Sequence, residues 1–64
     1  MKATLKELEM KFKNEGKSGY AVIKICDVMA NRNFQIGYFE DCAKYHGLSY
    51  ENTQVELVKY VGWN

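Results

Sequence analysis

Proline is absent from this chain of 64 residues, as are internal repeats and low-complexity segments. Without any linker-like stretch, the simplest organisation is a single small domain over residues 1–64. No apolar run approaches the roughly 20 residues of a membrane-spanning helix. The charged start "MKATLKELEMKFK" also lacks the apolar segment of a secretory signal. We therefore expect a cytoplasmic protein with no membrane partner.

Cysteine and histidine are scarce. A secreted domain this small usually carries about four or more cysteines, whereas this chain has only Cys26 and Cys42. We expect both to be reduced and buried on apolar stripes. Cys42 precedes His46, the only histidine, by four residues, but no CxxC pair accompanies them. A metal site or a cysteine nucleophile is therefore not favoured, and we expect a non-enzyme without cofactor, metal or small-molecule substrate.

The N-terminal segment has the features of a helix. Thr4 followed three residues later by Glu7 is a capping box, and Gly16 supplies a stop. One face carries apolar side chains at helical spacing, at Leu5, Leu8 and Phe12. These features predict a helix between Thr4 and Gly16.

The segment from residue 20 to 29 fits two structures. An apolar stripe at helical spacing favours a helix; its members are Val22, Ile25, Cys26 and Met29. Yet several of its residues are β-branched, so 20–26 could be a strand paired with 33–39. We predict the helix and keep a β-hairpin at 20–39 as the alternative.

Two further helices are predicted in the C-terminal half. Phe39, Cys42, Ala43 and His46 share one helix face, which Gly47-Leu48 would end in a Schellman motif. Ser49 or Asn52 would cap a last helix, whose buried side would comprise Val55, Leu57, Val58 and Val61. The predicted fold is thus an all-α, compact bundle of three to four short helices. The alternative is an α+β fold with the 20–39 hairpin.

The C-terminal half also resembles a helix-turn-helix of the winged-helix type over about residues 20–61. Ala43 and the turn Gly47-Leu48-Ser49 carry the resemblance, and residues 20–41 would supply the first helix and its connector. Thr53 stands where that motif has an aliphatic residue, and Val55 follows two places later. The resemblance implies a regulator of transcription that binds DNA as a dimer.

The charges of this half weigh against DNA. The candidate recognition helix carries Glu51 and Glu56 against a single Lys59, and Arg32 is the only arginine of the chain. Affinity for DNA rests on lysines and arginines that neutralise phosphates. If the segment does bind DNA, the residues expected to contact it are Lys44, Ser49, Tyr50, Asn52, Thr53, Gln54 and Lys59.

Aromatic side chains are abundant: nine residues, or 14% of the chain. Five tyrosines and a tryptophan exceed what so small a core can bury with every polar atom satisfied. Tyrosine and tryptophan are enriched among the residues that dominate protein interfaces. We therefore favour a small regulatory protein, such as a bacterial or phage inhibitor, that binds another protein or itself. Its expected anchors are Tyr45, Tyr50, Tyr60 and Trp63.

Overall fold

The computed structural model describes residues 2–63, which contain four strands and two helices. In chain order they are β1 (Lys2–Thr4), α1 (Leu5–Asn14), β2 (Gly19–Ile25), β3 (Ala30–Gln35), α2 (Phe39–Tyr45) and β4 (Gln54–Gly62). The fold is therefore α+β, and the predicted all-α bundle is wrong.

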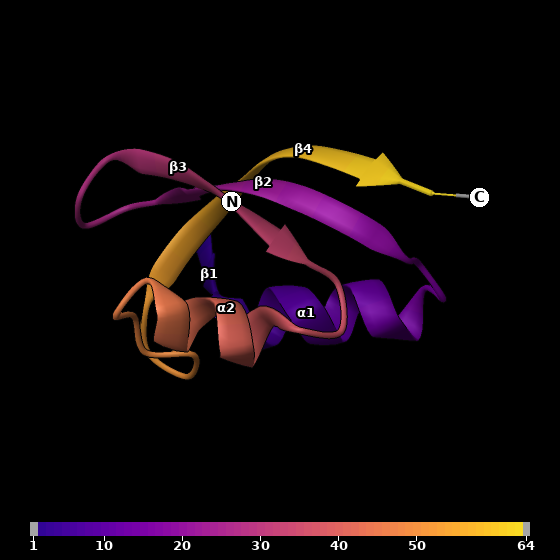
Figure 1. The fold of residues 1–64 in the computed structure, drawn as a ribbon, viewed down its shortest axis with the longest axis horizontal. Coiled ribbons are helices and arrows are strands. Elements are labelled where there is room, and N and C mark those ends of the chain that lie inside the picture. Colours follow the sequence, from indigo (N-terminus) through magenta and orange to yellow (C-terminus); the bar gives the residue numbers. More distant parts are fainter. Residues whose placement is uncertain (1, 64) are drawn as a thin grey trace.

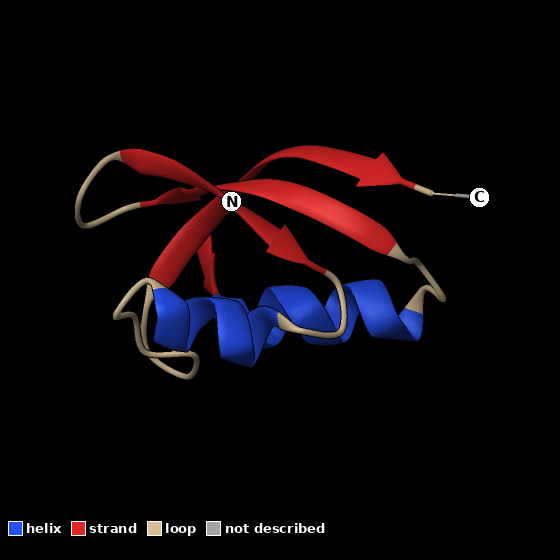
Figure 2. Ribbon diagram, in the orientation of Figure 1, coloured by secondary structure: helices blue, strands red, loops and turns tan. Residues whose placement is uncertain are grey.

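The strands form one antiparallel sheet in the order β1-β4-β2-β3. β1 runs parallel to β2 with β4 between them, and β3 runs parallel to β4 with β2 between them. Each of these pairs is joined through a helix, so the fold consists of two interleaved split β-α-β units. Both helices cover the same face of the sheet and leave the opposite face bare (Figures 1 and 2).

The core lies between this sheet and the two helices. Its largest fully buried side chains come from every layer: Phe34, Phe39, Leu5, Ile23, Ile25 and Val55. Phe34 and Phe39 meet edge to face, with their ring centroids 5.4 Å apart. Aromatic pairs of this kind add to the stabilisation that burial alone provides.

The predicted helix over residues 20–29 is wrong, and the alternative hairpin within residues 20–39 is confirmed, although its second strand is β3 (Ala30–Gln35) and not residues 33–39. β2 pairs with β3 from Tyr20 opposite Gln35 to Ile25 opposite Ala30. Side chains along β2 alternate between buried and half-buried, which is the two-residue period of a strand. The β-branched residues fit this pleated surface, and pairing with β4 on the other side of β2 outweighs the helical spacing of the apolar stripe.

The last predicted helix is also wrong. Residues 54–62 form β4, so no recognition helix follows Gly47, and the helix-turn-helix half of the predicted fold does not form. The register of β4 against β2 shifts at one point: Lys59 faces Val22, whereas Leu57 faces Ile23. Val58 is the extra residue of this bulge. Because a bulge interrupts strict alternation, the apolar spacing of the segment resembled that of a helix.

The first helix is confirmed in detail. The Thr4 hydroxyl accepts a hydrogen bond from the Glu7 backbone N–H at 3.2 Å, and the Glu7 carboxylate accepts one from the Thr4 N–H at 2.9 Å. At the other end Gly16 adopts a φ of 68°, and the Lys17 N–H donates back to the Phe12 carbonyl at 3.0 Å. Both ends are therefore closed by local hydrogen bonds.

The helix beginning at Phe39 is confirmed as well. Gly47 has a φ of 71°, and the Leu48 N–H donates to the Ala43 carbonyl at 2.8 Å, as expected for a Schellman motif. Leu48 then folds back against the core. No helix within residues 2–63 has the length and apolar character needed to cross a membrane.

The capping box makes a prediction about pH. Hydrogen bonds from the Thr4 backbone N–H and then from its hydroxyl lower the pKa of Glu7 below its usual 4.5. Their stabilisation is therefore present above about pH 4.5 and is lost as pH falls through the lowered value. Thr4→Ala should cost about 1 kcal/mol at pH 7. The urea midpoint of Glu7→Gln, which lacks the titrating carboxylate, should decline less than that of the wild type between pH 5 and pH 3. Equal declines in both proteins would contradict this role of Glu7.

Candidate functional site

The expected anchor Tyr50 has its hydroxyl engaged inside the molecule. It donates to the carboxylate of Glu9, on α1, at 2.5 Å. Glu9 is only 3% exposed and also accepts from the backbone N–H groups of Gly37 and Phe39, each at 3.0 Å. Burial, and after it the hydrogen bond to Glu9, raises the pKa of Tyr50 well above its ordinary 10.0. Glu9 and Tyr50 thus tie α1, the start of α2 and the loop before β4 together.

Tyr60 is likewise turned toward the helices. Its hydroxyl donates to the Ser18 carbonyl at 2.5 Å, and its ring stacks on Phe12 with a centroid separation of 5.4 Å. The Lys17 ammonium lies 5.0 Å from the centre of the Tyr60 ring, a cation–π distance. Tyr60 therefore closes the core at the end of α1, and its hydroxyl already has a partner.

Trp63 and Tyr20 form an aromatic pair at the open face of the sheet. Their ring centroids lie 5.6 Å apart, and Trp63 is 50% exposed. Tyr20 stands directly opposite Val61 of β4 and next but one to Val22 along β2, so these three side chains share that face. The bare face thus has an apolar, aromatic centre near the C-terminal end of β4.

Polar side chains surround this centre. On the β3 side, Gln35 faces Tyr20 and Asn33 faces Val22, and both are exposed. On the other side, Lys59 faces Val22, and further along β2 Lys24 faces Glu56. An apolar centre with an amide and lysine border has the composition of a protein-binding patch.

Tyr45 lies apart from this patch. It is the last residue of α2, on the face of the sheet that the helices cover, and it is 86% exposed. Its ring meets the His46 ring edge to face at 5.2 Å. The four expected anchors therefore lie in different parts of the structure, and of the four only Trp63 lies on the open face.

The seven residues proposed to contact DNA do not lie along one helix. Lys44 is in the last turn of α2, and Lys59 is on the open face of β4. Between them Ser49 and Thr53 close a turn: the Thr53 hydroxyl accepts from the Ser49 N–H at 3.0 Å, and the Ser49 hydroxyl accepts from the Asn52 N–H at 3.2 Å. Tyr50 is held by Glu9, and Gln54 is exposed at the start of β4.

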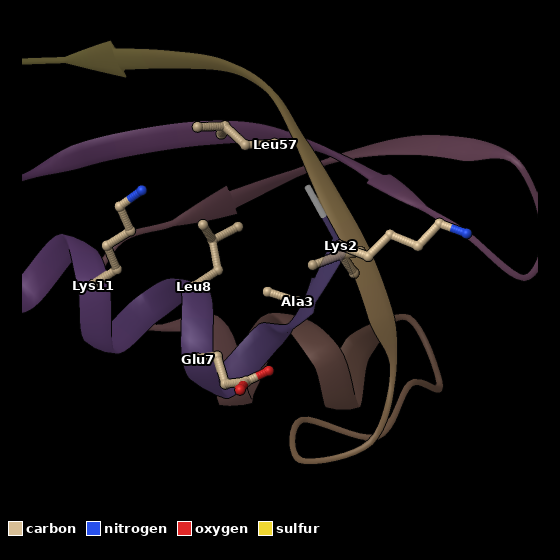
Figure 3. A pocket seen from close by; sticks show the side chains of 7 residues that line it. Lys2, Ala3, Glu7, Leu8, Lys11 and Leu57 are labelled. Atoms are coloured by element: carbon tan, nitrogen blue, oxygen red, sulfur yellow. The ribbon is translucent and has the colours of Figure 1, made fainter.

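A groove of about 420 Å³ opens between β1, α1 and β4. Ala3, Leu8 and Leu57 converge on it, and Lys11 extends along its side toward Leu57 (Figure 3). The Lys2 ammonium and the Glu7 carboxylate point away from it in the same view. The side chains that converge on the groove are therefore apolar, and the Lys11 ammonium lies beside them.

Both cysteines are free, as expected, but neither is fully buried, so that part of the prediction is wrong. Cys26 follows β2, and its Sγ lies 4.0 Å from the Glu56 carboxylate, whereas Cys42 packs against the core from α2. The His46 ring lies 5.7 Å from that of Phe34. Within residues 2–63 no group of three or more histidine, cysteine or acidic side chains is placed to hold a metal ion.

Tyr20 and Glu9 were missed by the sequence analysis. Tyr20 could have been found from the alternation of β2, which places it on the face opposite Ala21 and Ile23. Glu9 had no such signal, because its spacing from Lys13 is that of an ordinary surface ion pair. In the structure these two charges are 4.0 Å apart, and Glu9 is buried.

Comparison with known proteins finds no family model, no curated protein and no solved structure that matches the chain. What the protein binds must therefore be inferred from its own surfaces.

Proposed function

We propose that this protein is a small, non-enzymatic interaction protein that binds and modulates another protein through the open face of its sheet. The observation that carries the proposal is the pair of half-buried Tyr20 and half-exposed Trp63 at the apolar centre of that face. Rigid aromatic side chains with a polar tip contribute most of the binding energy in many protein interfaces. The amides and lysines around them suit the polar rim of such an interface.

The charges on the open face and the strand structure of β4 favour a protein partner over DNA. The lysines that the register places on this face are Lys2, Lys24 and Lys59, and Glu56 stands between Lys2 and Lys24. A duplex-binding surface needs several cations aligned with phosphates. The segment predicted to be a DNA-recognition helix forms strand β4 instead. The proposed partner is therefore a protein whose contact surface carries apolar pockets for the rings of Tyr20 and Trp63.

Site-specific crosslinking in the cells that make the protein tests this proposal. A photo-reactive amino acid in place of Gln35, which is exposed opposite Tyr20, should yield one discrete protein adduct. The same group in place of Tyr45, away from the open face, should not yield that adduct. Trp63→Ala should lower the yield at position 35, because loss of an anchor costs about 2 kcal/mol or more, roughly thirtyfold in affinity.

Urea unfolding of Trp63→Ala provides the stability control, since a half-exposed terminal ring should contribute little to folding. A nucleic-acid adduct at position 35, or a protein adduct unaffected by Trp63→Ala, would contradict the proposal. An adduct with the mass of two copies of this chain would show self-association through the face instead.

A further inference from the structure

The ionised side chains are unevenly divided between the two sides of the sheet. On the open face the register places one carboxylate, Glu56, and three lysines: Lys2, Lys24 and Lys59. The whole chain has nine cations, eight anions and a formal net charge of +1 at pH 7. The open face therefore carries a net charge of +2, which leaves −1 for the rest of the molecule.

The three lysines of the open face have no ion pair among residues 2–63. The ion pairs of this part of the chain all lie on α1 or in the loops beside it, and they join Lys6 to Glu51, Lys13 to Glu9 and Lys17 to Glu15. An interface that covers the open face removes water from the lysine ammonium groups. Acidic groups of the partner would therefore stabilise such an interface, because they replace the lost hydration.

Glu56 does not neutralise Lys59. It stands between Lys2 on β1 and Lys24 on β2, its direct neighbours across the sheet. Its carboxylate lies 4.0 Å from the Sγ of Cys26, which follows Lys24 on the side away from Lys59. Lys59 is exposed, and its partner on β2 is apolar. Within residues 2–63, Lys59 is therefore the lysine of this face without an acidic neighbour across the sheet.

Lys59 borders the aromatic centre of the open face. The next residue of β4 that the register places on this face is Val61, about 7 Å further along the strand. Val61 stands opposite Tyr20, whose ring packs against that of Trp63. A partner that receives the two rings in apolar pockets therefore brings its adjoining surface over the Lys59 ammonium.

A second copy of this chain and a nucleic acid both match this charge poorly. Two copies that met through their open faces would each bring a net positive surface, and like charges across an interface oppose association. A nucleic acid carries closely spaced phosphates, some of which would approach the Glu56 carboxylate beside Lys24. A single carboxylate on a protein can face Lys59 without approaching Glu56.

We infer that the partner presents an acidic contact surface, with an Asp or Glu carboxylate that pairs with Lys59 next to apolar pockets for Tyr20 and Trp63. This inference rests on the proposed function and adds the chemistry of the partner to it. The rings supply most of the affinity, whereas the ion pair orients the partner and raises its rate of association. A partner without the carboxylate is disfavoured, because it would cover the ammonium without a counter-charge.

Second-site variants in the crosslinking experiment test the inference. With the photo-reactive amino acid in place of Gln35, Lys59→Glu should lower the yield of the protein adduct at least about tenfold, because it opposes two anions. Lys59→Arg keeps the charge and should retain the yield. Lys44→Glu makes the same charge reversal on α2, away from the open face, and should change the yield less than about twofold. Circular dichroism checks that each variant is folded.

The partner's side of the contact provides a reciprocal test. Mass spectrometry of the adduct should find Asp or Glu within the crosslinked segment. Replacing that acid by lysine should lower the yield with the wild-type chain and restore the yield with Lys59→Glu. A merely structural role of Lys59 would not produce this exchange.

The outcomes separate the inference from the proposed function. If Trp63→Ala lowers the yield and Lys59→Glu does not, the inference is wrong and the proposed function stands. If no protein adduct forms, or Trp63→Ala leaves its yield unchanged, both are wrong. A nucleic-acid adduct, or an adduct of two copies of this chain, would likewise overturn the inference, because Lys59 would then not face a carboxylate of a partner protein.

Discussion

Glu9→Ala is expected to cost at least about 3 kcal/mol of the free energy of unfolding, because it leaves one buried and two partly buried donors without this acceptor. The Gly37 and Phe39 N–H groups and the Tyr50 hydroxyl all donate to this carboxylate, which is 3% exposed. A single core in a chain of this size rarely supplies more than about 3–5 kcal/mol. Urea unfolding at pH 7 should therefore find Glu9→Ala largely unfolded even without denaturant.

Two variants show whether the loss comes from these hydrogen bonds. Tyr50→Phe removes one donor and keeps the carboxylate, so it should cost only about 1 kcal/mol. Glu40→Ala removes an exposed carboxylate from neighbouring α2 and should change stability by less than about 0.5 kcal/mol. If Glu9→Ala were no more destabilising than Glu40→Ala, Glu9 would not hold the helices together.

The role of Glu9 also bears on the binding surface. By fixing the start of α2 and the loop before β4, it sets where β4 enters the sheet. β4 forms part of the open face, so that face depends on this buried contact. A variant that loosens the contact should impair both stability and binding at the open face, whereas Trp63→Ala should impair binding alone.

The sequence predicted those parts of the fold that local chemistry determines. The capping box of Thr4 and Glu7 and the turn at Gly47-Leu48 involve residues within one or two helical turns of each other, and both helices form where these features placed them. The strands depend on contacts between distant residues. β2 pairs with β4, and nothing within either segment alone specifies that register. Apolar spacing alone favoured helices in both.

The binding surface could be predicted only in part, for the same reason. Trp63 was expected to be an anchor, but its neighbour Tyr20 lies next to it only because Tyr20 pairs with Val61 across the sheet.

Gly19→Ala is the second change expected to have a large effect. Gly19 begins β2 opposite Gly62 and has a φ of 122°, a backbone conformation that residues with a side chain rarely adopt. A Cβ at this position would lie only 2.2 Å from the backbone carbonyl oxygen of Val61 and 2.7 Å from the Gly62 Cα. Because both neighbours are backbone atoms of the paired strand, β4 would have to move away. We expect a loss of about 2 kcal/mol, from strain and lost pairing together, which leaves the variant folded in the absence of denaturant.

Gly16→Ala is the matched control for this change. Gly16 also has a positive φ, 68°, but a Cβ there would meet nothing within 4 Å. It should therefore cost about 1 kcal/mol, from backbone strain alone. Urea unfolding gives both values, and amide exchange shows where the damage lies: Gly19→Ala should speed exchange at residues 60–62, whereas Gly16→Ala should affect only the end of α1. Equal losses of unfolding free energy in the two variants would mean that β4 shifts to accommodate the new Cβ at little cost. Since residues 60–62 adjoin Trp63, Gly19→Ala should also weaken binding at the open face.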